Sequence, residues 1–270
     1  MRTYLFADFK ALTPGTLDIV KASGVTDVVL GVAGSSKPFR LKGREDGWIK
    51  SIGWLTEAGI GVHLMPWMRR DEVFIRQAFE GMRPLFDTGH VSSLLLDCEW
   101  HWIHGGMPAV EAAELCRDKA DGIRLGVTGY TKVQESLDPL LQLCDYGCPQ
   151  AYGFWSPKED HWSHNPGSEP GAPQARAYRN WSDKPIVMGV AAYWLARPAR
   201  RGLPPMSYAD AWRANLQAAL RPPDGSSLEG IAIWSLKWLH RWSGHKDRMA
   251  LVQNLTSAAR HWDAKAGICR

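Results

Sequence analysis

The chain has 270 residues, of which 45% are hydrophobic and 22% are charged, proportions that suit a soluble globular protein and argue against a disordered or fibrous chain. The net charge of +4 is too small for the dense basic surface of a nucleic-acid-binding protein. It would still help the chain to approach an acidic polymer such as a bacterial cell wall.

Cysteine usage and the distribution of apolar residues narrow the class of protein further. The five cysteines form no regular framework, and the spacing of Cys144 and Cys148 is not that of a zinc knuckle. We therefore expect buried thiols in a reducing compartment. No signal peptide is visible, and no apolar run approaches the roughly 18 residues that a membrane span needs. These features predict cytoplasmic synthesis without a signal peptide and no membrane span.

Eight short apolar runs recur along the chain, each of the length of a β-strand and nearly continuous in apolar residues. Such runs are typical of parallel strands that are covered on both faces. The predicted strands are Thr3–Asp8, Asp27–Ala33, Gly61–Trp67, Ser92–Trp100, Arg124–Tyr130, Tyr146–Tyr152, Pro185–Tyr193 and Gly230–Leu236.

Amphipathic stretches lie between these runs and predict helices. The first helix opens at Thr13-Pro14, because proline suits an early helical position. The others are Asp46–Ala58, Asp71–Phe86, Pro108–Ala120, Thr131–Leu143, Ser207–Leu220 and His245–Ala259.

Strict alternation of strands and helices predicts an α/β fold, a single (β/α)8 TIM barrel that occupies residues 1–270. Two long connections interrupt this alternation: Gly153–Asn180 after the sixth strand and Trp194–Met206 after the seventh. Both follow the carboxyl ends of strands, which is the face where barrel enzymes build their active sites.

The barrel separates the carboxylates into two groups. Asp27, Asp145 and Asp183 precede strands, so we expect them to cap or to form turns at the opposite face. Asp8, at the end of the first strand, and the pair Asp97 and Glu99, at the end of the fourth, belong to the active face.

The run Leu94-Leu95-Leu96-Asp97-Cys98-Glu99-Trp100 is the strongest indication of a catalytic site in the sequence. Side chains alternate along a strand, so Asp97 and Glu99 point to one side while Leu96 and Cys98 point to the other. Two acids placed together raise one another's pKa. Glycoside hydrolysis uses such a pair, because it needs a protonated acid beside a carboxylate that stays ionised. The alternative is a structural cluster paired with Arg69, Arg70 or Lys237.

Aromatic residues support a sugar ligand. The fourteen tryptophans are an unusual number, and many fall in the expected active-face loops. A cleft lined by aromatic rings and a few carboxylates is what polysaccharide binding requires, although single rings can instead plug the mouth of the barrel. These tryptophans are Trp67, Trp100, Trp102, Trp155, Trp162, Trp194, Trp238 and Trp242, with Trp234 in the eighth strand and Tyr130, Tyr152 and Tyr193 at the ends of strands five to seven.

Histidines allow a competing metal site. His101 and His104 follow the acid pair, and a metal-dependent hydrolase would combine them with it. The first strand lacks the His-x-His that such barrels usually show, and no serine elbow or phosphate-binding loop is present. The sequence therefore predicts neither a metal nor another cofactor.

Three strand motifs resemble the glycoside hydrolase family 25 lysozymes, barrel muramidases that cut the glycan of peptidoglycan. They are the aspartate that closes strand one, the Asp-x-Glu that closes strand four, and the fifth strand Gly126-Val127-Thr128-Gly129-Tyr130. Pro149-Gln150-Ala151-Tyr152 and Ile233-Trp234-Ser235 also look like later strands of that family and of chitinase-like barrels. The first strand, Phe6-Ala7-Asp8-Phe9, lacks that family's usual Gly-x-Asp-x-Ser.

The resemblance implies a lysozyme-type glycosidase, such as a phage endolysin released to the cell wall, acting as a monomer on peptidoglycan or a related amino-sugar polysaccharide. Glu99 would be the general acid/base, Asp97 would stabilise charge or orient the substrate acetamido group, and Asp8 would support them. A non-catalytic carbohydrate-binding barrel and a metal-dependent hydrolase using His101 or His104 remain the alternatives. The expected substrate-binding residues are Tyr152, Trp102, Trp155, Trp194, Trp234, Tyr130 and Tyr193, with Trp102, Trp155 and Trp194 each showing an open ring face.

Overall fold

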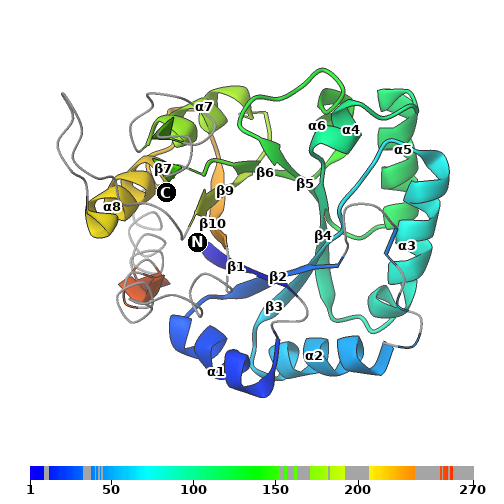
Figure 1. Cartoon of the computed structure of the whole chain (residues 1–270), viewed down its shortest axis with the longest axis horizontal. Coiled ribbons are helices and arrows are strands. Elements are labelled where there is room, and N and C mark those ends of the chain that lie inside the picture. Colours follow the sequence, from blue (N-terminus) through cyan, green and yellow to red (C-terminus); the bar gives the residue numbers. More distant parts are fainter. Residues whose placement is uncertain are drawn as a thin grey trace.

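Eight parallel strands close into a barrel in the computed structural model, and helices surround the ring (Figure 1). The strand order is β1-β2-β3-β4-β5-β6-β9-β10, with β10 hydrogen-bonded back to β1. The structure describes residues 1–8, 12–32, 38–39, 41, 43, 45–152, 155–156, 161–162, 171–181, 183–191, 207–234, 250, 252–254 and 256–257. The strands are β1 Arg2–Asp8, β2 Asp27–Gly31, β3 Gly61–Met65, β4 Val91–Asp97, β5 Leu125–Tyr130, β6 Tyr146–Gln150, β9 Ile186–Ala191 and β10 Leu228–Trp234.

Every predicted strand overlaps one of these eight, so the predicted (β/α)8 barrel is confirmed. The β-strands are recognisable in the sequence because both of their faces are covered: one by the barrel interior and the other by helices. In β4, for example, Leu94 and Leu96 pack in the outer layer beneath the helices, whereas Leu95 packs in the barrel interior.

Some helices begin at a residue whose side chain satisfies one of the first backbone N–H groups. Thr13 accepts from the backbone of Thr16 at the start of α1, and Asp71 accepts from that of Phe74 at the start of α3. The helices are α1 Pro14–Ser23, α2 Glu45–Glu57, α3 Glu72–Phe86, α4 Trp100–Ile103, α5 Ala109–Ala120, α6 Asp138–Leu143, α7 Ala172–Asn180 and α8 Tyr208–Ala219.

Three helices differ from the sequence prediction. α6 begins at Asp138 and not at Thr131, because Pro139 favours the first turn of a helix and the preceding residues form turns. α4 begins at Trp100, the last residue of the predicted fourth strand, and continues into a segment for which no helix was predicted. α7 lies within the predicted connection 153–180 together with the short hairpin β7 Trp155–Ser156 and β8 His161–Trp162. Of the predicted helix 245–259, residues 250, 252–254 and 256–257 are described and are helical. The predicted loop 194–206 lies outside the described residues.

Cys98, Cys116, Cys144 and Cys148 are free and buried, as the sequence predicts, while Cys269 lies outside the described residues. Within the described part of the chain, no helix is long and apolar enough to cross a membrane.

Candidate functional site

The acid pair lies at the carboxyl end of β4. Asp97 is the last residue of the strand, and Glu99 precedes the first residue of α4. Backbone hydrogen bonds hold this corner from both sides: the Asp97 N–H donates to Pro66 (2.9 Å) and the Cys98 N–H donates to Thr128 (2.9 Å). Cys98 packs in the outer layer of the core, so the predicted alternation is confirmed, with Asp97 on the opposite side of the backbone.

Asp8 ends β1 and therefore lies at the same end of the barrel as the acid pair. Its side chain lies outside the described residues, so its role as a supporting carboxylate stays a prediction.

Gln150, the last residue of β6, holds the two acids together. Its side-chain Nε2 donates to Asp97 Oδ1 at 3.3 Å and to Glu99 Oε1 at 3.0 Å. One amide group therefore contacts both carboxyl groups, which makes them neighbours. Sequence reasoning missed Gln150 as a site residue, although it is two residues from Tyr152 and so shares that residue's side of the strand.

The electrostatics of the mouth favour a proton on Asp97. Burial and the neighbouring charge of Glu99 raise the pKa of Asp97 well above its usual value. Burial and the charges of Glu99 and Asp97 also raise the pKa of the Tyr130 phenol, which ends β5. Burial and the like charge of Glu99 oppose ionisation of Asp97, and the two acids titrate as a pair, so the sequence-based expectation that Asp97 stays ionised remains a prediction.

Arg69 and Arg70, which could have formed salt bridges with Asp97 and Glu99, bind other groups instead. Arg70 donates to the backbone carbonyls of Trp102 (2.5 Å), Met107 (2.7 Å) and Ile103 (2.9 Å), and Arg69 pairs with Asp71 at 3.9 Å. Among the described residues, no salt bridge joins either arginine to the acid pair, and Lys237 lies outside them.

Two predicted aromatic residues meet at the same end of the barrel as the acids. Trp234 ends β10 and lies with its ring centroid 5.9 Å from that of Tyr152 and 4.8 Å from that of Phe6. Tyr152 is buried and Trp234 is half-buried, so together with half-buried Tyr130 they line the mouth of the barrel.

The prediction that Trp102 has an open ring face is wrong. Its side chain is 0% exposed, and its indole N–H donates to the Ser136 carbonyl at 2.8 Å. Burying the large indole under α4 removes apolar surface from water, and the carbonyl satisfies its polar edge. The backbone of Trp155 lies in β7, but its side chain, like all of Tyr193 and Trp194, lies outside the described residues.

The histidines after the acid pair face aromatic rings. His101 packs edge-on against Trp67, with ring centroids 4.5 Å apart, and His104 packs against Trp100 at 3.7 Å. The described residues contain no group of three or more potential ligands that could hold a metal ion.

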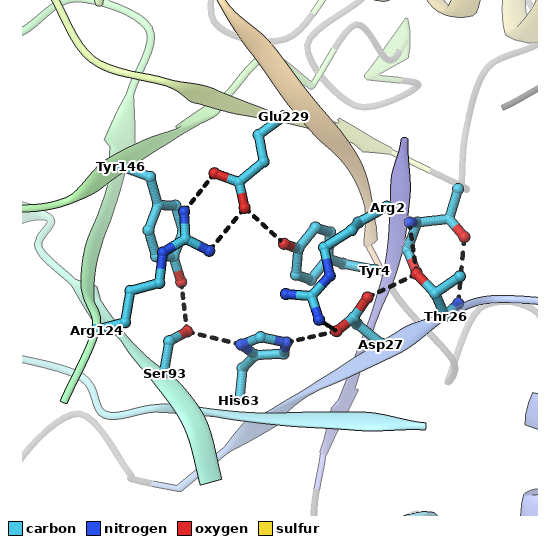
Figure 2. Close-up of polar contacts among 10 residues, drawn as sticks. Arg2, Tyr4, Thr26, Asp27, His63, Ser93, Arg124, Tyr146 and Glu229 are labelled. Atoms are coloured by element: carbon cyan, nitrogen blue, oxygen red, sulfur yellow. Dashed lines mark hydrogen bonds and ion pairs between the residues drawn. The ribbon is translucent and has the colours of Figure 1, made fainter. Parts of the chain in front are cut away.

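A second polar cluster closes the opposite end of the barrel (Figure 2). Asp27, at the start of β2, bonds to His63 Nε2 at 2.9 Å, and His63 Nδ1 lies 2.7 Å from Ser93 Oγ. The Ser93 hydroxyl in turn lies 2.9 Å from the Tyr146 hydroxyl. Nearby, Arg124 pairs with Glu229 through both carboxylate oxygens.

We call the buried residues Asp27, His63, Ser93 and Tyr146 the floor network. Asp27, His63 and Ser93 form an acid–imidazole–hydroxyl chain, but all three are almost wholly inaccessible to solvent, so no substrate reaches them. Two glycines leave room for the side chains of Asp27 and Tyr146. A Cβ on Gly61 would lie 2.2 Å from the Asp27 carboxylate, and one on Gly126 would lie 2.2 Å from the Tyr146 ring. The floor network is therefore structural.

One assignment of protons satisfies the chain in the floor network. With the proton of a neutral imidazole on Nε2, His63 donates to Asp27, Ser93 donates to Nδ1, and Tyr146 donates to Ser93. The face assignment made from sequence is thus confirmed for Asp27. It also holds for Asp145, which precedes β6 and accepts from the Leu125 backbone N–H at 2.7 Å.

No known sequence family and no curated protein matches the chain. Solved structures share its fold. The GH18 chitinase ChiB of Flavobacterium johnsoniae matches with a TM-score of 0.60 and 12% identity, over 96% of this chain and 94% of that one. The spore cortex-lytic enzyme SleL of Bacillus cereus matches with a TM-score of 0.57 and 13% identity, over 94% and 74%.

A protein that is described as an inhibitor has the same fold. The xylanase and alpha-amylase inhibitor protein XAIP-II of Scadoxus multiflorus matches with a TM-score of 0.59 and 13% identity, over 96% of this chain and 98% of that one. The chain therefore shares the TIM-barrel fold of these structures, and the similarity does not single out family 25. Because this fold supports different functions, the function of the barrel has to be inferred from the residues of the site.

Proposed function

We propose that the protein is a glycosidase that hydrolyses the glycan of bacterial peptidoglycan as an N-acetylmuramidase, and that it meets its substrate when it is released from the cytoplasm during phage lysis. The observation that carries this proposal is the pair Asp97 and Glu99, bridged by the Gln150 amide at the active face of the barrel. Chitinases and a cortex-lytic enzyme on the same fold support the choice of an amino-sugar polysaccharide.

The shared proton provides the chemistry. Before reaction, burial and the Glu99 charge keep the proton on Asp97. Positive charge that develops at the anomeric carbon favours ionised Asp97, so the proton moves within the pair to Glu99. Glu99 donates it to the glycosidic oxygen, which leaves with the electron pair of the broken C–O bond. Water then bonds to the anomeric carbon and gives one proton back to the acid pair, which restores its starting state.

A non-catalytic carbohydrate-binding barrel is the second candidate, because inhibitor proteins share the fold. Zymography on purified cell walls, with and without a chelator, separates the candidates. We expect clearing that is insensitive to the chelator. Binding without clearing would favour the non-catalytic barrel, and clearing that the chelator abolishes would favour a metal-dependent hydrolase.

Gln150→Met tests the bridge between the acids. Methionine keeps the length of the side chain but removes the donor that favours the ionised carboxyl groups, so the pKa values of the pair should rise. A hydrogen bond to a charged group contributes about 1.5–3 kcal/mol, which corresponds to roughly one to two pKa units. We expect the whole pH–rate profile to move to higher pH by about one unit or more.

The matched control for this variant is Gln142→Met, at an exposed position of α6. It should leave the profile in place. A profile that stays unchanged in Gln150→Met would show that the amide does not tune the pair.

A further inference from the structure

Trp100 is the most conspicuous side chain near the acid pair that the proposed mechanism does not use. It follows Glu99 directly, opens α4, and is 61% exposed. Leaving an indole in water forgoes the gain of burying a large apolar surface. Trp102, two residues later in the same helical turn, is fully buried.

The ring of Trp100 is supported from within the protein. His104, one turn further along, lies with its ring centroid 3.7 Å from that of Trp100, at an interplanar angle of 45°. The helical turn itself is fixed by Trp102, which bonds to Ser136 beneath it. Trp100 and His104 therefore form an exposed aromatic pair on a helical turn that the protein holds in place. We call this pair of residues the rim platform.

Arg70 holds the C-terminal end of α4 in place. Its guanidinium donates to three backbone carbonyls of the segment 102–107, where the last carbonyls of α4 lack partners within the helix. The Met107 N–H donates back to the Arg70 carbonyl at 3.1 Å. The contact is close enough that a Cβ on Gly105 would lie 2.3 Å from Arg70 Cβ. A ring held this way loses little conformational freedom on binding.

From this geometry we propose that the rim platform is a binding subsite for one sugar ring of the polymer, next to the ring that is cleaved. The inference rests on the proposed function for the identity of the polymer. A glycan chain whose glycosidic oxygen lies at Glu99 continues past the next residue of the protein, which is Trp100. The apolar face of a pyranose stacks on an indole, and the neighbouring imidazole of His104 packs against that indole.

Binding can be measured without hydrolysis in the Glu99→Gln background, using sedimentation with insoluble purified peptidoglycan. We expect Trp100→Ala to weaken binding by about tenfold, the order that follows when one aromatic ring loses a stacked partner. Trp100→Phe should retain most of the binding, because it keeps a ring. Since Trp100 is mostly exposed, both variants should unfold at the temperature of their parent.

Trp54→Ala is the matched control, because Trp54 lies on α2, where it contacts Lys50. It should bind like the parent. Equal binding by Trp100→Ala and its parent would overturn the rim platform, and so would a Trp100→Phe that binds as weakly as the alanine variant. The result is independent of catalysis: cell-wall cleavage by Glu99→Gln would refute the hydrolytic mechanism and leave the binding comparison intact.

Discussion

Glu99→Gln should hydrolyse purified peptidoglycan about two to four orders of magnitude more slowly than the parent, the usual contribution of general acid–base catalysis. Glutamine keeps the size of the side chain and an oxygen that accepts from Gln150, so the barrel should fold normally. What it loses is the proton that the leaving oxygen needs. Release of soluble fragments, measured over time at equal protein concentration, gives the rate.

Asp145→Asn is the control on the opposite face, where Asp145 accepts from the Leu125 backbone and pairs with Arg117 at 3.2 Å. It should leave turnover nearly intact. Cell-wall hydrolysis by Glu99→Gln at the parental rate would show that Glu99 is not the acid.

The pH dependence of the parent carries a further expectation. The active pair holds one proton, so the profile should be bell-shaped and describe the pair as a unit. Because the pKa of Asp97 is raised, the alkaline limb should lie well above the value of about 4 that free carboxyl groups show. Asp97→Asn removes the neighbouring charge, and its residual activity should lose the alkaline limb at lower pH than the parent.

Asp27→Ala should lower the free energy of unfolding by about 1–3 kcal/mol, the range expected when a buried hydrogen-bonding group loses its partner. The loss follows from the floor network. Asp27 is fully buried and accepts from His63, from the Thr26 hydroxyl at 2.6 Å and from Arg2 at 3.2 Å. Removing the carboxylate leaves these donors without their acceptor. Urea unfolding at neutral pH measures the difference.

Asp183→Ala is the matched control, because Asp183 also precedes a strand but is exposed. It should change stability by no more than about 0.5 kcal/mol. An Asp27→Ala protein as stable as this control would show that the floor network does not stabilise the barrel.

Acid should weaken the same network. Burial alone would raise the pKa of Asp27, but hydrogen bonds from His63 and Thr26, together with the charge of Arg2, hold it below its usual value. A lowered pKa contributes stability that is present above about pH 4 and is lost as the pH falls through the folded-state value. The stability difference between the parent and Asp27→Ala should therefore shrink below about pH 4.

The sequence predicted the barrel because each strand is an apolar run covered on both sides. It also predicted the side of the acid pair, because the alternation of side chains in β4 runs through Leu96 and Cys98. The floor network could not be predicted: Asp27, His63 and Ser93 lie 36 and 30 residues apart, and the barrel alone brings them together.

The tryptophans after the acid pair show where sequence reasoning fails. Trp100 and Trp102 both follow the strand, and composition does not distinguish them. Because the chain turns into α4 after Glu99, residues two apart point to nearly opposite sides of a helix, and only Trp102 reaches the core. Gln150 was missed for a different reason, since an amide becomes important only through the two acids that another strand places beside it.

Mass spectrometry of the fragments released from purified peptidoglycan tests the central claim most directly. A muramidase cleaves the bond after N-acetylmuramic acid, so we predict soluble fragments that carry a new reducing end on that sugar. Reducing ends on N-acetylglucosamine would contradict the proposed bond. Intact glycan strands after incubation with the folded parent protein would contradict hydrolysis by Asp97 and Glu99 altogether.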